Sequence, residues 1–201
     1  MAWIKQIEYE ESEGKLRKIY DRIKGEDNYI DNILKVHSLR PYSLEGHMAL
    51  YKYVLHNSTN TFPMHFLEAM GTYVSALNNC SYCVDHHFTG MRRLLGNHTK
   101  ADLIKKALLS DQPEMVFEEK ECALFEYAKK LTKDPEKITQ QEIKKMKALG
   151  FDDGEILEIN QVVSYFCYAN RTVLGLGVST KGDILGLSPN DQSEDDSWSH
   201  S

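Results

Sequence analysis

Apolar residues recur along this chain at intervals of three and four positions, which is the spacing of one face of an α-helix. Almost every segment follows this pattern, and no stretch has the alternation that predicts a half-buried strand. The first clear example ends before Gly25, which stands where a helix cap is expected, and comprises Leu16, Ile19, Tyr20 and Ile23. The pattern therefore predicts an all-α fold, a single-domain helical bundle.

The helix boundaries follow from prolines, glycines and capping residues. The helix that begins at Cys80 should stop at Gly96. The last long helix is apolar on most sides, which is typical of a helix inside a bundle or under a subunit interface. Helices are predicted over residues 41–55, 63–77, 80–95, 118–133, 139–149 and from 152 onward. Three pairs have the spacing of a capping box: Thr99 with Asp102, Thr139 with Glu142, and Asp152 with Glu155.

The chain has the size and organisation of one domain. Its 201 residues are 41% hydrophobic, enough for a single core, and neither an internal repeat nor a long linker divides them. Residues 189–201 are acidic, polar and without periodicity. We therefore expect one helical domain over residues 1–188 and a disordered acidic tail over residues 189–201.

Charge and hydropathy exclude two classes of partner. Asp and Glu outnumber Lys and Arg by 30 to 24, and no basic run is present that could follow a phosphate backbone, so nucleic acid is not expected to bind. The start of the chain lacks the apolar core of a signal peptide, and no stretch reaches the ~18 apolar residues of a membrane span. A cytoplasmic protein with no membrane partner is expected.

The candidate chemistry centres on two cysteines. Four cysteines are too few for a secreted disulfide scaffold, and Cys80 and Cys83 have the spacing of a redox pair. Asn78 and Asn79 indicate a turn, which places Cys80 in the first turn of a helix, where the positive dipole end favours a thiolate. His87 lies on the same helical face as both cysteines, whereas His86 points about 120° away from Cys80.

A carboxylate on the preceding helix belongs to the same hypothesis. Glu68 lies in an apolar helix, where it could accept a proton or simply pair with an arginine. The cysteines and His87 could also form a mere packing stripe with Met91, but paired cysteines at a helix N-terminus favour a function. A zinc site is disfavoured, because no second pair of Cys or His ligands at the usual spacing is present.

Glu68, Cys80, Cys83 and His87, with their spacing, resemble the signature of the alkylhydroperoxidase D-like (AhpD-like), peroxidase-related branch of the carboxymuconolactone decarboxylase superfamily. The resemblance extends over roughly residues 5 to 187. It includes Leu44-Glu45-Gly46 with Leu50-Tyr51 upstream, Ser75 to His87 around the motif, and Tyr168-Ala169-Asn170-Arg171 with Gly175-Leu176-Gly177-Val178 downstream. It implies an all-α fold in which a helical hairpin holds the motif, assembled as trimers or hexamers, without metal or haem cofactor.

The resemblance also implies a mechanism. Cys83 would be the thiolate that attacks a hydroperoxide, Cys80 would resolve the sulfenic acid into a disulfide, and His87 and Glu68 would relay protons. A thioredoxin-like or lipoyl-bearing dithiol donor would then reduce the disulfide. Where the best-studied branch has a histidine before the second cysteine, this chain has Tyr82, which is a poor base and is expected to donate a hydrogen bond or shape the pocket.

The leading hypothesis is thus a thiol-dependent peroxidase with catalytic residues Cys83, Cys80, His87, Glu68 and Tyr82. A disulfide oxidoreductase without peroxidase activity would use the same residues. A redox-sensing oligomeric protein, whose disulfide changes its assembly, is the alternative from another class. A decarboxylase is disfavoured, because that branch does not depend on a cysteine pair.

Overall fold

The computed structural model describes residues 2–187, so the predicted tail at residues 189–201 lies outside the described residues. The predicted all-α fold is confirmed, since the described residues contain helices and turns and no strand. Short 3₁₀ turns at Glu26–Asn28, Pro113–Met115 and Pro135–Lys137 separate some of the helices. The α-helices are α1 (Gly14–Ile23), α2 (Asn32–Lys35), α3 (Pro41–Leu55), α4 (Met64–Leu77), α5 (Ser81–Leu95), α6 (His98–Leu109), α7 (Glu119–Lys133), α8 (Gln140–Ala148) and α9 (Asp153–Leu176).

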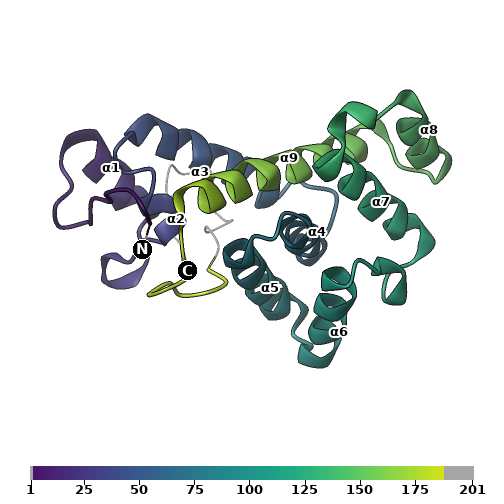
Figure 1. Cartoon of the computed structure of the whole chain (residues 1–201), viewed down its shortest axis with the longest axis horizontal. Helices are drawn as coiled ribbons and strands as arrows, with labels where there is room; N and C mark the ends of the chain where they lie inside the picture. Colours follow the sequence, from purple (N-terminus) through teal and green to yellow (C-terminus); the bar gives the residue numbers. More distant parts are fainter. Residues whose placement is uncertain (1, 188–201) are drawn as a thin grey trace.

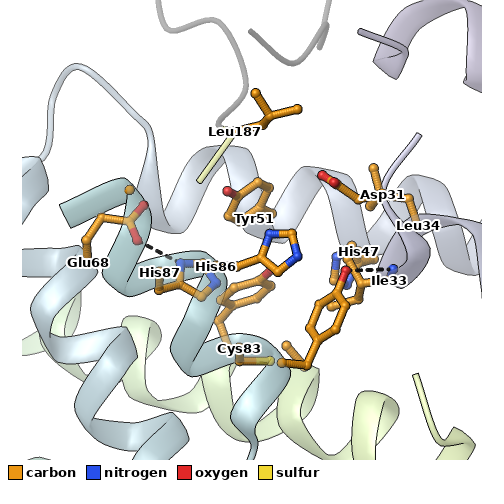
Figure 2. Close-up of a pocket in the computed structure, with 14 residues that line it drawn as sticks. Asp31, Ile33, Leu34, His47, Tyr51, Glu68, Cys83, His86, His87 and Leu187 are labelled. Carbon is orange, nitrogen blue, oxygen red and sulfur yellow. Dashed lines mark hydrogen bonds and ion pairs between the residues drawn. The ribbon is translucent and has the colours of Figure 1, made fainter. Parts of the chain in front are cut away.

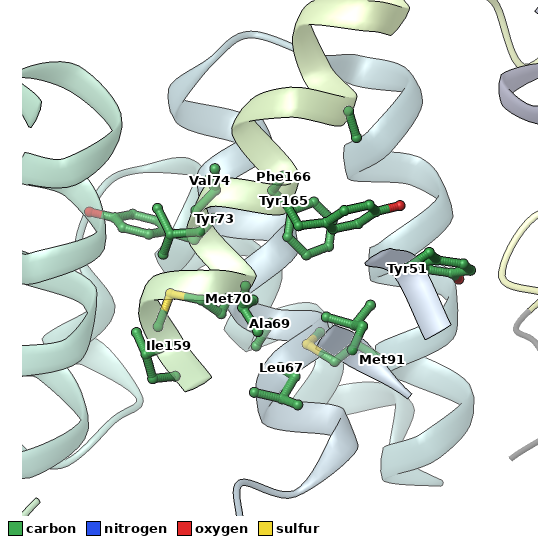
Figure 3. Packing of buried hydrophobic residues seen from close by; sticks show 14 of the residues in the cluster. Tyr51, Leu67, Ala69, Met70, Tyr73, Val74, Met91, Ile159, Tyr165 and Phe166 are labelled. Carbon is green, nitrogen blue, oxygen red and sulfur yellow. The ribbon is translucent and has the colours of Figure 1, made fainter. Parts of the chain in front are cut away.

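Helix α4 is the central element of the bundle. It pairs with α5 as a hairpin and also contacts α3, α6, α7 and α9 (Figure 1). Its residues are buried from Phe66 to Ser75 without interruption. Side chains from α4, α5, α9 and α3 interlock in this core, as Figure 3 shows. A helix enclosed on all sides holds its side chains in fixed positions, which matters for Glu68.

A close approach of α4 and α9 depends on one glycine. A Cβ atom added to Gly71 would lie 2.1 Å from Cζ of Phe166, so only a residue without a side chain fits there. Phe166 is fully buried against this gap and brings α9 against the middle of α4. The contact fixes α9 beside the helix hairpin.

Most of the predicted caps are present, and two are wrong. Gly96 has φ +59° and ends α5, and the capping boxes at Thr139 and Asp152 both form. The cap predicted at Thr99 is replaced by Asn97, whose side chain accepts a hydrogen bond from the Lys100 amide, because α6 starts directly after Gly96. Gly25 has φ −83° and is not a left-handed cap, since α1 ends when Lys24 becomes extended.

The segment after α9 turns back toward the start of the chain. Gly177, with φ +63°, ends α9. The following residues, yellow in Figure 1, pass between α2 and α5, where Asp183 accepts a hydrogen bond from the Asn32 amide at 3.1 Å. Among the helices of residues 2–187, none combines the length and apolar character needed to cross a lipid bilayer.

Candidate functional site

The cysteine pair lies at the N-terminus of α5, as predicted, but one residue earlier than expected. Cys80 is the N-cap residue and not part of the first turn. Asn79 adopts φ +57°, and the Cys80 amide donates to the Ser75 carbonyl at 2.9 Å, so α4 turns tightly into α5. Both sulfurs are reduced in this structure, and both residues are at most 2% exposed. They pack in a small apolar cluster with Val36, Val173 and Val178.

The two thiols differ in acidity because they interact with each other. The Cys83 side chain, acting as donor, lowers the pKa of Cys80, and the Cys83 backbone amide and Asn170 lower it further against the effect of burial. The interaction with Cys80 and burial raise the pKa of Cys83 well above its usual value, although Asn170 and Ser75 oppose this. Cys80 is therefore the more acidic thiol of the pair.

Asn170 is held in place beside the pair by other polar groups. Its amide donates to Ser75 Oγ at 3.0 Å, and its oxygen accepts from the Asn78 amide at 2.9 Å. Because Asn170 is on α9 and the other two residues are on or at the end of α4, this network joins the two helices behind the cysteines. The thiols thus have a buried polar neighbour that the capping and periodicity arguments did not identify.

Glu68 and His87 form a buried pair between α4 and α5. Glu68 is 3% exposed, and its Oε2 lies 2.7 Å from Nδ1 of His87. The partner of Glu68 is thus a histidine and not the arginine considered from the sequence; Nε2 of His56 is a further neighbour, 3.9 Å from Oε1. Gly90 packs against the carboxylate, and a Cβ atom there would make an ordinary van der Waals contact with it at 3.4 Å. A carboxylate bonded to one ring nitrogen fixes the imidazole orientation.

Tyr82 directs its hydroxyl away from the thiols. It donates to Asp183 Oδ2 at 2.6 Å and accepts from the Ile33 amide at 3.1 Å. Burial, and then the negative charge of Asp183, raise the pKa of Tyr82 well above its usual value. Tyr82 is therefore a protonated hydrogen-bond donor at neutral pH, and it fastens the segment after α9 to α5.

A pocket joins these groups. Its cavity volume is about 40 Å³, which leaves room for only a few water molecules or a very small reactant. Figure 2 shows Cys83 at its floor, with His87 and Glu68 on one side and Asp31 on the other. Tyr51 and Tyr165 also line it, and burial raises the pKa of both phenols well above its usual value. Two protonated phenols thus accompany the thiol.

Four of the five predicted residues line this pocket, namely Cys83, Tyr82, His87 and Glu68. Cys80 lies behind Cys83 and does not line it. The pocket is also lined by His86, which the sequence analysis did not favour as a catalytic residue because it points away from Cys80 on the helix. The sequence did not indicate Tyr165, which is on a regular apolar face, or Asp183, which lies in an irregular segment without periodicity. Tyr51 was part of the resemblance, but no role was predicted for it.

Comparison with known proteins gives structural matches only. No protein-family profile matches the chain, and no curated protein sequence matches it. A solved structure described as the alkylhydroperoxidase AhpD core, an uncharacterised peroxidase-related protein from Ralstonia eutropha JMP134, matches with a TM-score of 0.76 at 17% identity. That match covers 89% of this chain and 91% of the other.

Two further structures are similar. A peroxidase-related protein from Silicibacter sp. TM1040 has a TM-score of 0.70 at 20% identity and covers 81% of this chain and 83% of its own. The debrominase Bmp8 in its apo form has a TM-score of 0.65 at 16% identity, with 82% and 85% covered. The fold therefore occurs in proteins named for different chemistries. The chain has the fold of the alkylhydroperoxidase AhpD core, as its cysteine motif predicted.

Proposed function

We propose that this protein is a thiol-dependent peroxidase that reduces hydroperoxides through a dithiol–disulfide cycle of Cys80 and Cys83. The observation that carries the proposal is the shared pocket, in which Cys83 lies with the hydrogen-bonded Glu68–His87 pair. A thiol, an oriented imidazole and a buried carboxylate are the parts needed to form a thiolate and to return a proton to a leaving group.

The proposed reaction begins with attack of the Cys83 thiolate on an oxygen of the hydroperoxide. The O–O bond breaks, Cys83 becomes a sulfenic acid, and the leaving alkoxide or hydroxide takes a proton. Cys80 then attacks the Cys83 sulfur, so that the disulfide forms and water leaves. Two electrons have passed from the thiols to the peroxide. A dithiol donor, thioredoxin-like or lipoyl-bearing, reduces the disulfide by exchange.

The order of the two cysteines rests on access. Cys83 lines the pocket and Cys80 does not, which supports Cys83 as the attacking sulfur. Because the pKa of Cys83 is raised and that of Cys80 is lowered, the Cys83 thiol must give its proton to Cys80 or His87 before it attacks. Tyr51 and Tyr165 are protonated donors in the same pocket and are suited to stabilise the leaving oxygen.

The test is to add hydroperoxide to the reduced protein and follow its thiols by mass spectrometry. We expect a Cys80–Cys83 disulfide in the parent and a trappable sulfenic acid at Cys83 in Cys80→Ser. Cys122→Ser is the matched control, because Cys122 is partly exposed and bonds only weakly to the Phe117 carbonyl. This control should form the disulfide at the parental rate.

Three other outcomes would change the proposal. A sulfenic acid trapped at Cys80 in Cys83→Ser, with none at Cys83 in Cys80→Ser, would reverse the roles of the two sulfurs. Thiols that are inert to every hydroperoxide would contradict the peroxidase. If those same thiols exchanged with a disulfide substrate, the protein would be a disulfide oxidoreductase. A stoichiometric oxidation that only changes assembly would indicate a redox sensor.

We further propose that the protein is a homo-oligomer, a trimer or hexamer, in the cytoplasm. Support comes from α3 and α9, which contact each other and leave large apolar side chains exposed, among them Leu50, Tyr53 and Leu174. Apolar side chains of this size are typical of subunit interfaces. Analytical ultracentrifugation of the parent and of Tyr53→Glu tests this, because a charge in an interface should dissociate the oligomer.

A further inference from the structure

A second group of side chains with metal-binding chemistry lies beside the thiols. Asp31, His86 and Asp183 each offer one ligand atom, and these three atoms lie within 4.8 Å of one another. The residues come from three separate segments: the residue before α2, helix α5, and the loop after α9. Asp31 and His86 also line the thiol pocket, where Figure 2 shows Asp31 across from Glu68.

His86 has a buried nitrogen with no hydrogen bond. Its side chain is 10% exposed, and within residues 2–187 Nε2 finds no hydrogen-bond partner. That atom lies 3.3 Å from Asp183 Oδ2, but the geometry is not that of a hydrogen bond. A buried polar atom without a hydrogen bond is unfavourable. Two ligands on one cation at ~2.1 Å in tetrahedral geometry are separated by about 3.4 Å, which matches the 3.3 Å between His86 Nε2 and Asp183 Oδ2.

The surroundings hold the three side chains in place. The His86 ring stacks on Tyr82 with ring centroids 4.5 Å apart. Asp183 accepts from the Tyr82 hydroxyl through Oδ2 and from the Asn32 amide through Oδ1. Tyr29 donates to Asp31 Oδ1 at 2.8 Å. Ligating carboxylates are commonly oriented by such hydrogen bonds from a second layer of residues.

We propose that Asp31, His86 and Asp183 form a binding site for a divalent cation in the wall of the thiol pocket. One imidazole and two carboxylates suit Zn²⁺ and Mn²⁺, and three protein ligands leave coordination positions free for water or a substrate oxygen. The site uses neither cysteine, so it is independent of the proposed thiol cycle. A bound cation would join the loop after α9 to α5 and to the segment before α2.

Cation uptake can be measured with two probes. Mn²⁺ prefers oxygen and nitrogen ligands over thiolates, so electron paramagnetic resonance of free Mn²⁺ reports binding to the reduced parent protein. Zn²⁺ binds more tightly but also to thiolates, so its uptake is measured by equilibrium dialysis on the double variant Cys80→Ser/Cys83→Ser. We expect one cation per chain in both experiments, and Zn²⁺ should displace Mn²⁺ from the double variant.

Variants locate the site. His86→Asn and Asp183→Asn should each weaken cation binding by at least about tenfold. If either variant does not give the parental circular dichroism spectrum, Asp31→Asn replaces it in the test. The matched control is His98→Asn, because His98 is exposed at the start of α6, and it should bind as the parent does. The cation should raise the melting temperature of the parent and of the control, but not of the ligand variants. The proposal would be overturned if neither Mn²⁺ nor Zn²⁺ bound stoichiometrically. It would also be overturned if the folded ligand variants bound the cation as tightly as the parent does.

Discussion

Replacement of Glu68 by glutamine isolates the contribution of one negative charge to the site. The substitution keeps the size of the side chain and removes the charge that faces Nδ1 of His87 at 2.7 Å. Because Glu68 is only 3% exposed, water cannot replace the lost interaction. The amide of Glu68→Gln can still make a neutral hydrogen bond, so the imidazole should remain in place but lose its electrostatic support as a proton acceptor.

The expected magnitude follows from the two kinds of hydrogen bond. A bond to a charged group contributes about 1.5–3 kcal/mol and a neutral one about 0.5–1.5 kcal/mol, so the charge accounts for about 1–1.5 kcal/mol. At about 1.36 kcal/mol for each factor of ten, this corresponds to a rate of disulfide formation about 5- to 13-fold lower. The loss should be in reactivity, since an uncharged buried side chain with a hydrogen bond is not costly to the fold.

The assay measures Cys80–Cys83 disulfide formation after addition of hydroperoxide, with samples quenched by acid and separated by mass. Alkylation of Cys83 by iodoacetamide provides a second rate that does not depend on peroxide chemistry. Glu126→Gln is the matched control, because Glu126 is 64% exposed and its ion pair with Lys145 should contribute little. Rates of Glu68→Gln equal to those of the control, in a protein of unchanged melting temperature, would refute a role for the Glu68–His87 pair.

Three other outcomes follow from the structure. Gly71→Ala should lower the free energy of unfolding in urea by about 1–3 kcal/mol, because the added methyl group overlaps the Phe166 ring. The pKa of Cys80 is held below its usual value, so its alkylation should rise with pH through a midpoint below 9, and Cys83→Ala should move this midpoint upward because the thiol that stabilises the Cys80 anion is removed. Tyr82→Phe should speed hydrogen exchange in residues 179–187, because Asp183 loses the hydroxyl that holds this segment on α5.

Each of these has its own control. Gly46→Ala adds a methyl group to α3 where no atom lies within 4 Å, and should stabilise the protein by about 0.5–1 kcal/mol; the same sign for Gly71→Ala would contradict the packing argument. A Cys80 midpoint unmoved by Cys83→Ala would mean that the two thiols do not share a proton. Tyr42→Phe is the control for Tyr82→Phe, because it changes an exposed phenol and should leave hydrogen exchange unaltered. Equal exchange rates in Tyr42→Phe and Tyr82→Phe would contradict the role of Tyr82.

The sequence predicted those features that local rules determine. Helical spacing identified the buried face of α1. The capping boxes at Thr139 and Asp152 are present because each depends on residues only three positions apart. The predicted cap of α6 at Thr99 was wrong by two residues. Asn97 directly follows the left-handed Gly96, so α6 begins there and Thr99 becomes its second residue.

The part of the site that could not be predicted depends on distant segments. His86 was set aside because the wheel of a single helix places it away from Cys80, but the pocket is bounded by α5 together with the segment before α2 and the loop after α9. Asp31 and Asp183 lie in irregular segments without periodicity, where nothing local indicates that they meet. Glu68 was identified because a carboxylate in an apolar helix is conspicuous even when its partner is unknown.

The large separation in sequence between Tyr82 and Asp183 has a consequence during biosynthesis. The hydrogen bond between them spans 101 residues of sequence. At about 5–20 residues per second, a ribosome needs roughly 5–20 s to add Asp183 after Tyr82. For that interval the nascent chain contains both cysteines without Asn170 or the segment that covers the pocket. The thiols of the newly synthesised chain are therefore exposed to solvent, to oxidants and to other disulfides. This exposure ends only when the folded surroundings that set their acidity have formed.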